Sequence, residues 1–163
     1  MLTMLLRRIV LFKRDDRGVQ LVELALALPV LILLFAAVAE FGRYYQAYTT
    51  LAKGSRTAVR YMATARANGL DDAAGKNLLV YGNLAGTGSP IVKDLKVSNV
   101  VIERRNEAGA LTNGFPATVT VKVTNFKHTP IFNLGKLLNS SLTMAIDIKP
   151  SVTMRYLLTQ PPI

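Results

Sequence analysis

The feature that most constrains this chain is an apolar run near its N-terminus. Residues 19–39 contain two strongly polar side chains, Gln20 and Glu23, and from Leu24 onward the run is interrupted by Pro29 alone. A helix of about 20 such residues spans roughly 30 Å, the thickness of the hydrocarbon core of a bilayer. The sequence therefore predicts a transmembrane helix over residues 19–40, and no second run is long enough to cross a membrane.

Two residues inside this predicted span need an explanation. The carboxylate of Glu23 lies in it, and an ionisable side chain at the bilayer centre costs about 2.5–3.5 kcal/mol on insertion scales, so we interpret Glu23 as functional. Pro29 in mid-span removes a helical hydrogen bond and predicts a kink in the helix. That kink is compatible with simple packing and with a functional hinge.

Basic residues flank the run unequally. One basic residue, Arg43, follows it within residues 40–52, whereas five precede it: Arg7, Arg8, Lys13, Arg14 and Arg17. This asymmetry places the N-terminus in the cytoplasm and the rest of the chain outside. An uncleaved anchor and an ordinary signal peptide, cleaved at the small residues 37–39, both fit such a pattern. The long leader with its two acids, Asp15 and Asp16, argues against the ordinary signal peptide.

Composition excludes several classes of function. The net charge is +10, but no basic tract with interleaved aromatic residues and no nucleic-acid-binding motif occurs, so no nucleic-acid partner is predicted. The absence of cysteine excludes disulfides and thiolate catalysis. His128 is the single histidine, and its loop-like surroundings beside Lys127 predict a surface group. No nucleotide-binding motif is present. We expect no enzymatic activity, no cofactor and no metal site.

Helical periodicity continues beyond residue 40. Aromatic residues cluster where an interfacial belt is expected: Phe41, Tyr44, Tyr45 and Tyr48. Apolar and small residues then recur at spacings of three and four: Tyr48, Leu51, Ala52, Ser55, Ala58, Val59 and Met62. A second face carries Lys53, Arg56 and Arg60, which we interpret as solvated rather than as a binding site for anionic lipid or an acidic partner. One helix from near Val19 to about Ala67, roughly 70 Å long, is predicted.

The remaining sequence predicts an exterior α+β domain over residues 69–163. A short helix over residues 71–82 starts with two acids and ends with glycine. Strands are expected over residues 97–103, 117–124 and 142–149 and after Pro150, with Val119, Val121 and Val123 on one face. Asn113-Gly114 favours a tight turn, and residues 132–138 a short amphipathic helical turn. The apolar face of this antiparallel sheet needs a cover, which the exterior half of the long helix, residues 41–68, can supply.

The N-terminal pattern resembles a known family. A basic leader (residues 1–18) ending in Gly18, followed by an apolar helix with glutamate at its fifth position, looks like the class III signal of type IV pilins and pseudopilins. The longer pattern is similar to the TadE-like family, the pseudopilin-like proteins of the tight-adherence (Flp) pilus system. It consists of RGVQLVELALALP at residues 17–29, EFGR at 40–43, AKGSR at 52–56 and VRY at 59–61. The resemblance covers about residues 14–64.

The resemblance implies a fold, a processing step and partners. The fold is the pilin-like lollipop, in which a long helix is the stem. A prepilin peptidase would cleave after Gly18, and the new amine of Val19 would lie within about a helical turn of Glu23, which in pilin-like assemblies is thought to register neighbouring subunits. Many pilins have phenylalanine at the position of Val19. The implied protein is a minor pseudopilin of the bacterial inner membrane, with its C-terminal domain periplasmic.

The partners implied are the prepilin peptidase, other pilin-like subunits, the inner-membrane assembly platform and membrane lipid. Incorporation at or near the base or tip of the pilus fits this role. The alternative is a single-pass membrane-anchored binding module, not processed as a pilin, whose exterior domain recognises a ligand.

Overall fold

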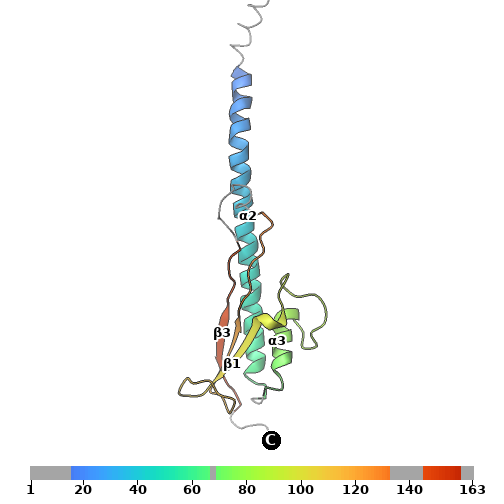
Figure 1. The fold of residues 1–163 in the computed structure, drawn as a ribbon, viewed down its shortest axis with the longest axis vertical. Coiled ribbons are helices and arrows are strands. Elements are labelled where there is room, and N and C mark those ends of the chain that lie inside the picture. The colour runs from blue at the N-terminus through green and yellow to red at the C-terminus, as the bar shows by residue number, and fades with distance from the viewer. Residues whose placement is uncertain (1–15, 67–68, 133–144, 159–163) are drawn as a thin grey trace, which may run out of the picture.

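A computed structural model of the protein describes residues 16–66, 69–132 and 145–158. Among these residues the elements are two helices, α2 (Asp16–Met62) and α3 (Asp72–Tyr81), a 3₁₀ turn (Val97–Asn99) and three strands, β1 (Val100–Arg105), β2 (Thr118–Val123) and β3 (Ser151–Arg155). Figure 1 shows a long rod, the N-terminal part of α2, that ends in a small domain built around the C-terminal part of the same helix. Residues 1–15 of the predicted leader lie outside the described residues.

Helix α2 is continuous for 47 residues and includes Pro29. At a rise of 1.5 Å per residue it is about 70 Å long, as predicted. The helix is unbroken on both sides of Pro29. The kink expected at this residue stays a prediction.

The helix ends at Met62 rather than near residue 67. Its last turn tightens, with the amide of Thr64 donating to the carbonyl of Tyr61 at 3.1 Å. Beyond it, the amide of Leu157 donates to the carbonyl of Ala63 at 2.9 Å, and the hydroxyl of Tyr156 donates to the carbonyl of Ala65. Hydrogen bonds from the C-terminal part of the chain therefore satisfy carbonyls that a longer helix would have used itself.

The two halves of α2 lie in different environments. None of its most apolar stretch is buried inside the protein, and α2 is, among the described residues, the one helix long and apolar enough to cross a membrane. This is consistent with a membrane anchor or a signal sequence. The second half buries the predicted stripe completely at Leu51, Ser55, Ala58, Val59 and Met62, whereas Tyr48 is exposed.

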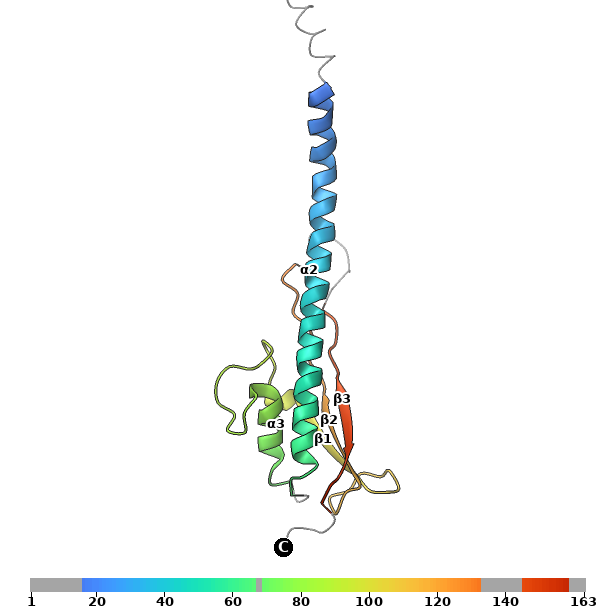
Figure 2. The same ribbon diagram turned by 180° about the vertical axis from the view of Figure 1, so that it is seen from behind.

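The sheet confirms the predicted α+β class. Its strand order is β1-β2-β3, all antiparallel, and Val121 pairs with Ile102 on one side and with Val152 on the other. The three valines of β2, at positions 119, 121 and 123, are buried. Helix α2 covers β2 and β3, and α3 packs beside α2 against β1 (Figure 2). The long helix and the sheet thus form one two-layer core, to which α3 adds a second helix.

Helix α3 matches the predicted residues 71–82. It ends at Gly82, whose backbone is left-handed with φ of 74° and whose amide donates to the carbonyl of Leu78 at 3.1 Å. The acids at its start both form ion pairs: Asp71 with Arg66 at 2.9 Å and Asp72 with the buried Arg104 of β1. They tie α3 to the end of α2 and to the sheet.

The strand predicted over residues 142–149 does not form as a regular strand in its described part. Residues 142–144 lie outside the described residues, and Asp147 forms an isolated bridge with Lys127. Ile148 is buried as predicted, but Ile146 is exposed. A single bridge to one neighbouring segment does not impose the alternation of a sheet strand.

One predicted turn differs from the structure, and a second cannot be compared with it. The tight turn between β1 and β2 lies at residues 106–110, with Gly109 at φ of 77°, rather than at Asn113-Gly114. The helical turn predicted over residues 132–138 lies outside the described residues beyond Phe132.

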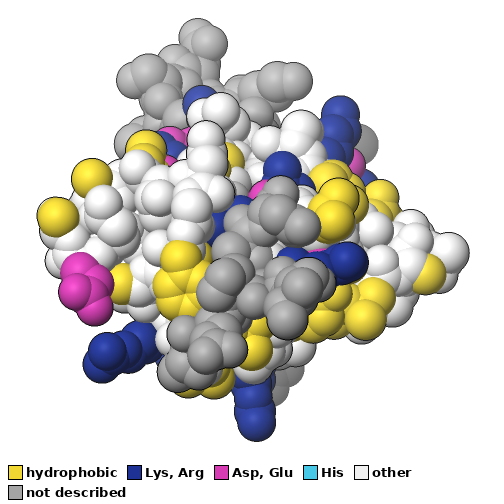
Figure 3. Space-filling model, turned by 90° about the horizontal axis from the view of Figure 1, so that it is seen from below, with side chains coloured by type: hydrophobic (Ala, Val, Ile, Leu, Met, Phe, Trp, Pro, Cys, Tyr) yellow, Lys and Arg dark blue, Asp and Glu magenta, His cyan; other side chains and the backbone are white. Residues whose placement is uncertain are grey.

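Viewed from the end far from the N-terminal rod, the domain shows lysine and arginine side chains that lie apart from one another (Figure 3).

Candidate functional site

The residues predicted for processing and subunit registration lie together at the N-terminal end of α2. Gly18, Val19 and Glu23 are exposed, and a Cβ added at Gly18 would meet no atom within 4 Å. Val19 and Glu23 are four residues apart in one helix and so share a face. Within the part of the chain that the structure describes, Glu23 has no hydrogen-bond or ion-pair partner. Pro29 is exposed as well.

A second polar site, not predicted from the sequence, lies where the apolar half of α2 ends. Glu40 is 1% exposed, and its carboxylate accepts hydrogen bonds from four groups. His128 Nε2 donates at 2.7 Å and Arg43 Nη1 at 3.3 Å, both to Oε1. The backbone amides of Ile131 and Phe132 donate to Oε2 at 3.2 and 3.5 Å. We call this arrangement the Glu40 clasp, because it fixes the loop after β2 to the long helix.

The clasp corrects the prediction for His128. This residue is buried, not a surface group: Nε2 is occupied by Glu40 and its ring meets the ring of Tyr44 edge-on at a centroid distance of 5.9 Å. The local sequence gave no sign of this, since the partner lies 88 residues away. A signal was available in Glu40 itself, a carboxylate directly after an apolar run. Tyr44 is half-buried, which leaves Phe41, Tyr45 and Tyr48 as the exposed members of the predicted belt.

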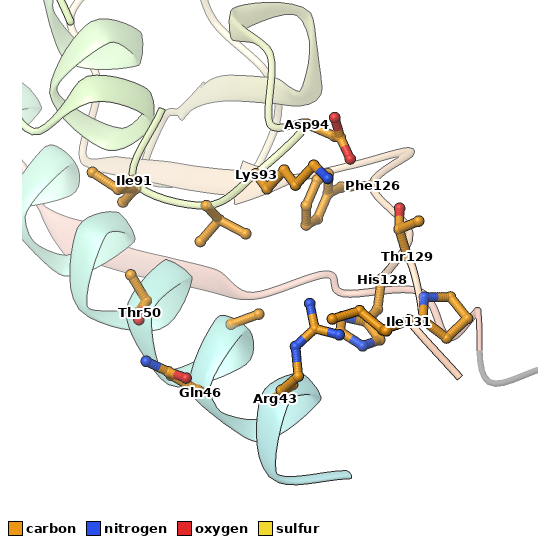
Figure 4. A pocket seen from close by; sticks show the side chains of 13 residues that line it. Arg43, Gln46, Thr50, Ile91, Lys93, Asp94, Phe126, His128, Thr129 and Ile131 are labelled. Carbon is orange, nitrogen blue, oxygen red and sulfur yellow. The ribbon is translucent and has the colours of Figure 1, made fainter. Parts of the chain in front are cut away.

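A cavity of about 330 Å³ lies beside the clasp, between α2 and two loops (Figure 4). Arg43, Gln46 and Thr50 line it from the helix. The loop before the 3₁₀ turn and the loop after β2 supply the remaining walls, among them Ile91, Lys93, Asp94, Phe126 and Thr129. Within the described residues no group of three His, Cys, Asp or Glu side chains could hold a metal ion. The arrangement holds two segments together, and the cavity offers mixed polar and apolar contacts.

The basic face predicted as solvated is exposed. Lys53, Arg56 and Arg60 lie on the side of α2 that faces away from the core.

Comparison with known proteins adds one match. The family model described as TadE-like protein matches residues 18–60. The matched segment begins at the predicted cleavage site, includes Glu23 and Glu40, and ends two residues before α2 does. No curated protein matches the chain, and no solved structure matches it.

Proposed function

We propose that this chain is a minor pseudopilin that acts in the assembly of a tight-adherence (Flp-type) pilus, because the family model described as TadE-like protein matches its residues 18–60. The family implies a place in the Tad pilus machinery. A minor rather than a major subunit is proposed because the match is to the TadE branch. The partners proposed are the prepilin peptidase, other pilin-like subunits and the assembly platform of the inner membrane.

The observation that carries this proposal is one helix with two environments. The exposed apolar part, residues 19–39, is about 31 Å long and therefore matches the hydrocarbon thickness of a bilayer. The same helix then continues, without a break, as the central element of the exterior core. A rigid connection of this kind transmits any axial or rotational displacement of the membrane half directly to the domain. A domain that only has to be held at a membrane does not need such a rigid connection to its anchor.

Glu23 supplies the second support. An unpaired carboxylate among lipid-facing residues is unfavourable, and the pairing of Glu23 with a cation would remove that cost. Cleavage after Gly18 would create such a cation, the amine of Val19, on the same face of the helix and about 6 Å away along its axis. In an assembly, the amine of one subunit pairing with Glu23 of the next would fix the axial register of the two helices.

The processing step is tested by the N-terminal sequence of the protein isolated from cells that make the pilus. We expect it to begin at Val19, and Gly18→Ala to accumulate a longer precursor. An intact Met1, or a start at Glu40, would contradict the proposal. Gly42→Ala is a matched control, because a Cβ at Gly42 also meets no atom within 4 Å. It should leave processing unchanged.

Subunit registration is tested by Glu23→Leu. We expect the variant to insert into the membrane normally and to abolish pilus assembly. The control moves the charge without removing it: Glu23→Leu combined with Leu24→Glu keeps the composition but rotates the carboxylate by about 100° around the helix. This double variant should also fail to assemble. Normal pili from either variant would favour an anchor that plays no part in registration.

The second candidate function is a single-pass membrane-anchored binding module, and the cavity beside Arg43 is the observation that favours it. Its lining mixes cationic and apolar groups, as ligand sites do. The two functions predict opposite outcomes for the Glu23 variants. A binding module needs only an anchor and should tolerate them.

A further inference from the structure

The loop that follows β2 carries two exposed apolar side chains beside the membrane half of α2. Ile131 is 66% exposed and Phe132 is 50% exposed. Phe41, the first residue of α2 after Glu40, is exposed as well. Removal of exposed apolar side chains from water is favourable, so Ile131 and Phe132, which are adjacent in the loop, gain from an apolar partner.

The Glu40 clasp fixes the height of this surface along the helix. The amides of Ile131 and Phe132 both donate to Glu40, which directly follows the exposed apolar residues 19–39. The two loop residues therefore lie level with the end of the predicted span. The loop is attached at this level by its backbone, and the side chains of both residues remain exposed.

This height corresponds to the interfacial layer of a bilayer. If residues 19–39 fill the hydrocarbon core, the layer between that core and bulk water is about 5–7 Å thick on each side. Glu40 and Phe41 are about 1.5 and 3 Å beyond the end of the core along the axis. Arg43 lies about 6 Å beyond it, within the headgroup layer, where its partly exposed guanidinium can contact lipid phosphate.

We propose that Ile131 and Phe132 insert into the lipid interface beside α2, as a second membrane contact made by the exterior domain. Lipid is the occupant because the surface lies directly beyond an apolar helix stretch of which no part is buried inside the protein. A single membrane helix leaves the whole molecule free to change its tilt relative to the bilayer. A second contact on one side fixes which face of the domain points toward the membrane. The inference rests on the membrane placement that the proposed function assumes.

The chain contains no tryptophan, so a single substitution provides a site-specific reporter. Phe132→Trp is made in the full chain and incorporated into phosphatidylethanolamine–phosphatidylglycerol vesicles that contain phosphatidylcholine brominated near either end of its acyl chains. Phe115→Trp is the matched control, since Phe115 is an exposed phenylalanine, 43% exposed, in the loop between β1 and β2 at the far end of the domain. Phe35→Trp reports on the span itself.

We expect about a twofold or larger excess of quenching for Phe132→Trp over Phe115→Trp, because an interfacial side chain lies about 5–10 Å into the boundary between headgroups and acyl chains. The lipid brominated nearer the headgroup should quench it more strongly than the other. Phe35→Trp should be quenched and should lie deeper. Ile131→Trp provides the same test should Phe132→Trp fail to fold.

Three results would overturn the inference, and they can be distinguished from one another. Quenching of Phe35→Trp with none of Phe132→Trp leaves the membrane span, and the proposed function, intact but removes the second contact. A blue-shifted emission of Phe132→Trp without lipid quenching also removes the second membrane contact. It would show that the side chain is buried away from both water and lipid, and so assign the surface to a contact with another protein chain. If Phe35→Trp is not quenched either, the membrane placement itself is wrong, and the proposed function falls with it.

Discussion

Removal of the Glu40 carboxylate should destabilise the exterior domain by a large fraction of its total stability. Glu40→Ala leaves His128 and the amides of Ile131 and Phe132 without their acceptor in a buried or half-buried setting. A hydrogen-bonding group that is left buried and unsatisfied costs about 1–3 kcal/mol, so the loss of the acceptor for three donors should amount to several kcal/mol. Since a domain is stable by only about 5–15 kcal/mol, the loss should be visible as a large shift of the unfolding midpoint.

His128→Ala should cost less than Glu40→Ala. The carboxylate would keep Arg43 and two amides, and the variant would lose one hydrogen bond to a charged group, worth about 1.5–3 kcal/mol. The ring contact with Tyr44 contributes about 0.5–1.5 kcal/mol more. The double variant should be more stable than the sum of the two effects predicts, by about 1–2 kcal/mol, because the two side chains are in contact.

The measurement is denaturant unfolding of the full chain in detergent micelles, followed by the near-ultraviolet circular dichroism of its six tyrosines. Glu107→Ala, which removes an exposed glutamate from the turn between β1 and β2, is the matched control and should change stability by less than about 0.5 kcal/mol. Hydrogen exchange at the amides of Ile131 and Phe132 should become faster in Glu40→Ala. This account of the clasp would be refuted if the losses of stability in Glu40→Ala and His128→Ala simply added in the double variant. It would also be refuted if Glu40→Ala lost no more stability than Glu107→Ala.

Three further predictions concern the exterior domain. Gly82→Ala should cost about 1–2 kcal/mol, because φ of 74° is unfavourable with a Cβ, and an unchanged thermal midpoint would argue against this reasoning. Arg104→Ala should cost about 1.5–3 kcal/mol, because Asp72 loses its hydrogen bonds to a charged partner. A variant as stable as wild type in denaturant unfolding would contradict this. The hydrogen bond from Arg66 lowers the pKa of Asp71. The stability that this pair adds is therefore present above the unfolded pKa of about 3.9 and is lost as the pH falls through the lower folded value. Asp71→Asn should therefore flatten the acid limb of a profile of unfolding free energy against pH. An acid limb identical to that of wild type would exclude the pair as its source.

Local patterns were sufficient for the helices and for most of the sheet. The apolar run, the stripe from Leu51 to Met62 and the alternation of valines in β2 each depend on periodicity within a single element, and the structure confirms all three. The cap of α3 at Gly82 is equally local. The prediction of a regular strand over residues 142–149 was wrong at Ile146, because regular pairing depends on a neighbour that the local pattern does not specify.

By itself, the sequence determined that one long helix has an apolar first half and a second half with a core-facing stripe, and it identified Gly18, Val19 and Glu23 as the residues to test. Those inferences need only the chemistry of consecutive residues. The tertiary structure alone decided that Glu40 and His128 form a buried pair, that α2 ends at Met62, and that Ile131 and Phe132 lie level with the end of the apolar run. Each of these depends on a contact between residues about 90 positions apart, which no local pattern encodes, because its energy arises only when the fold excludes water from both partners.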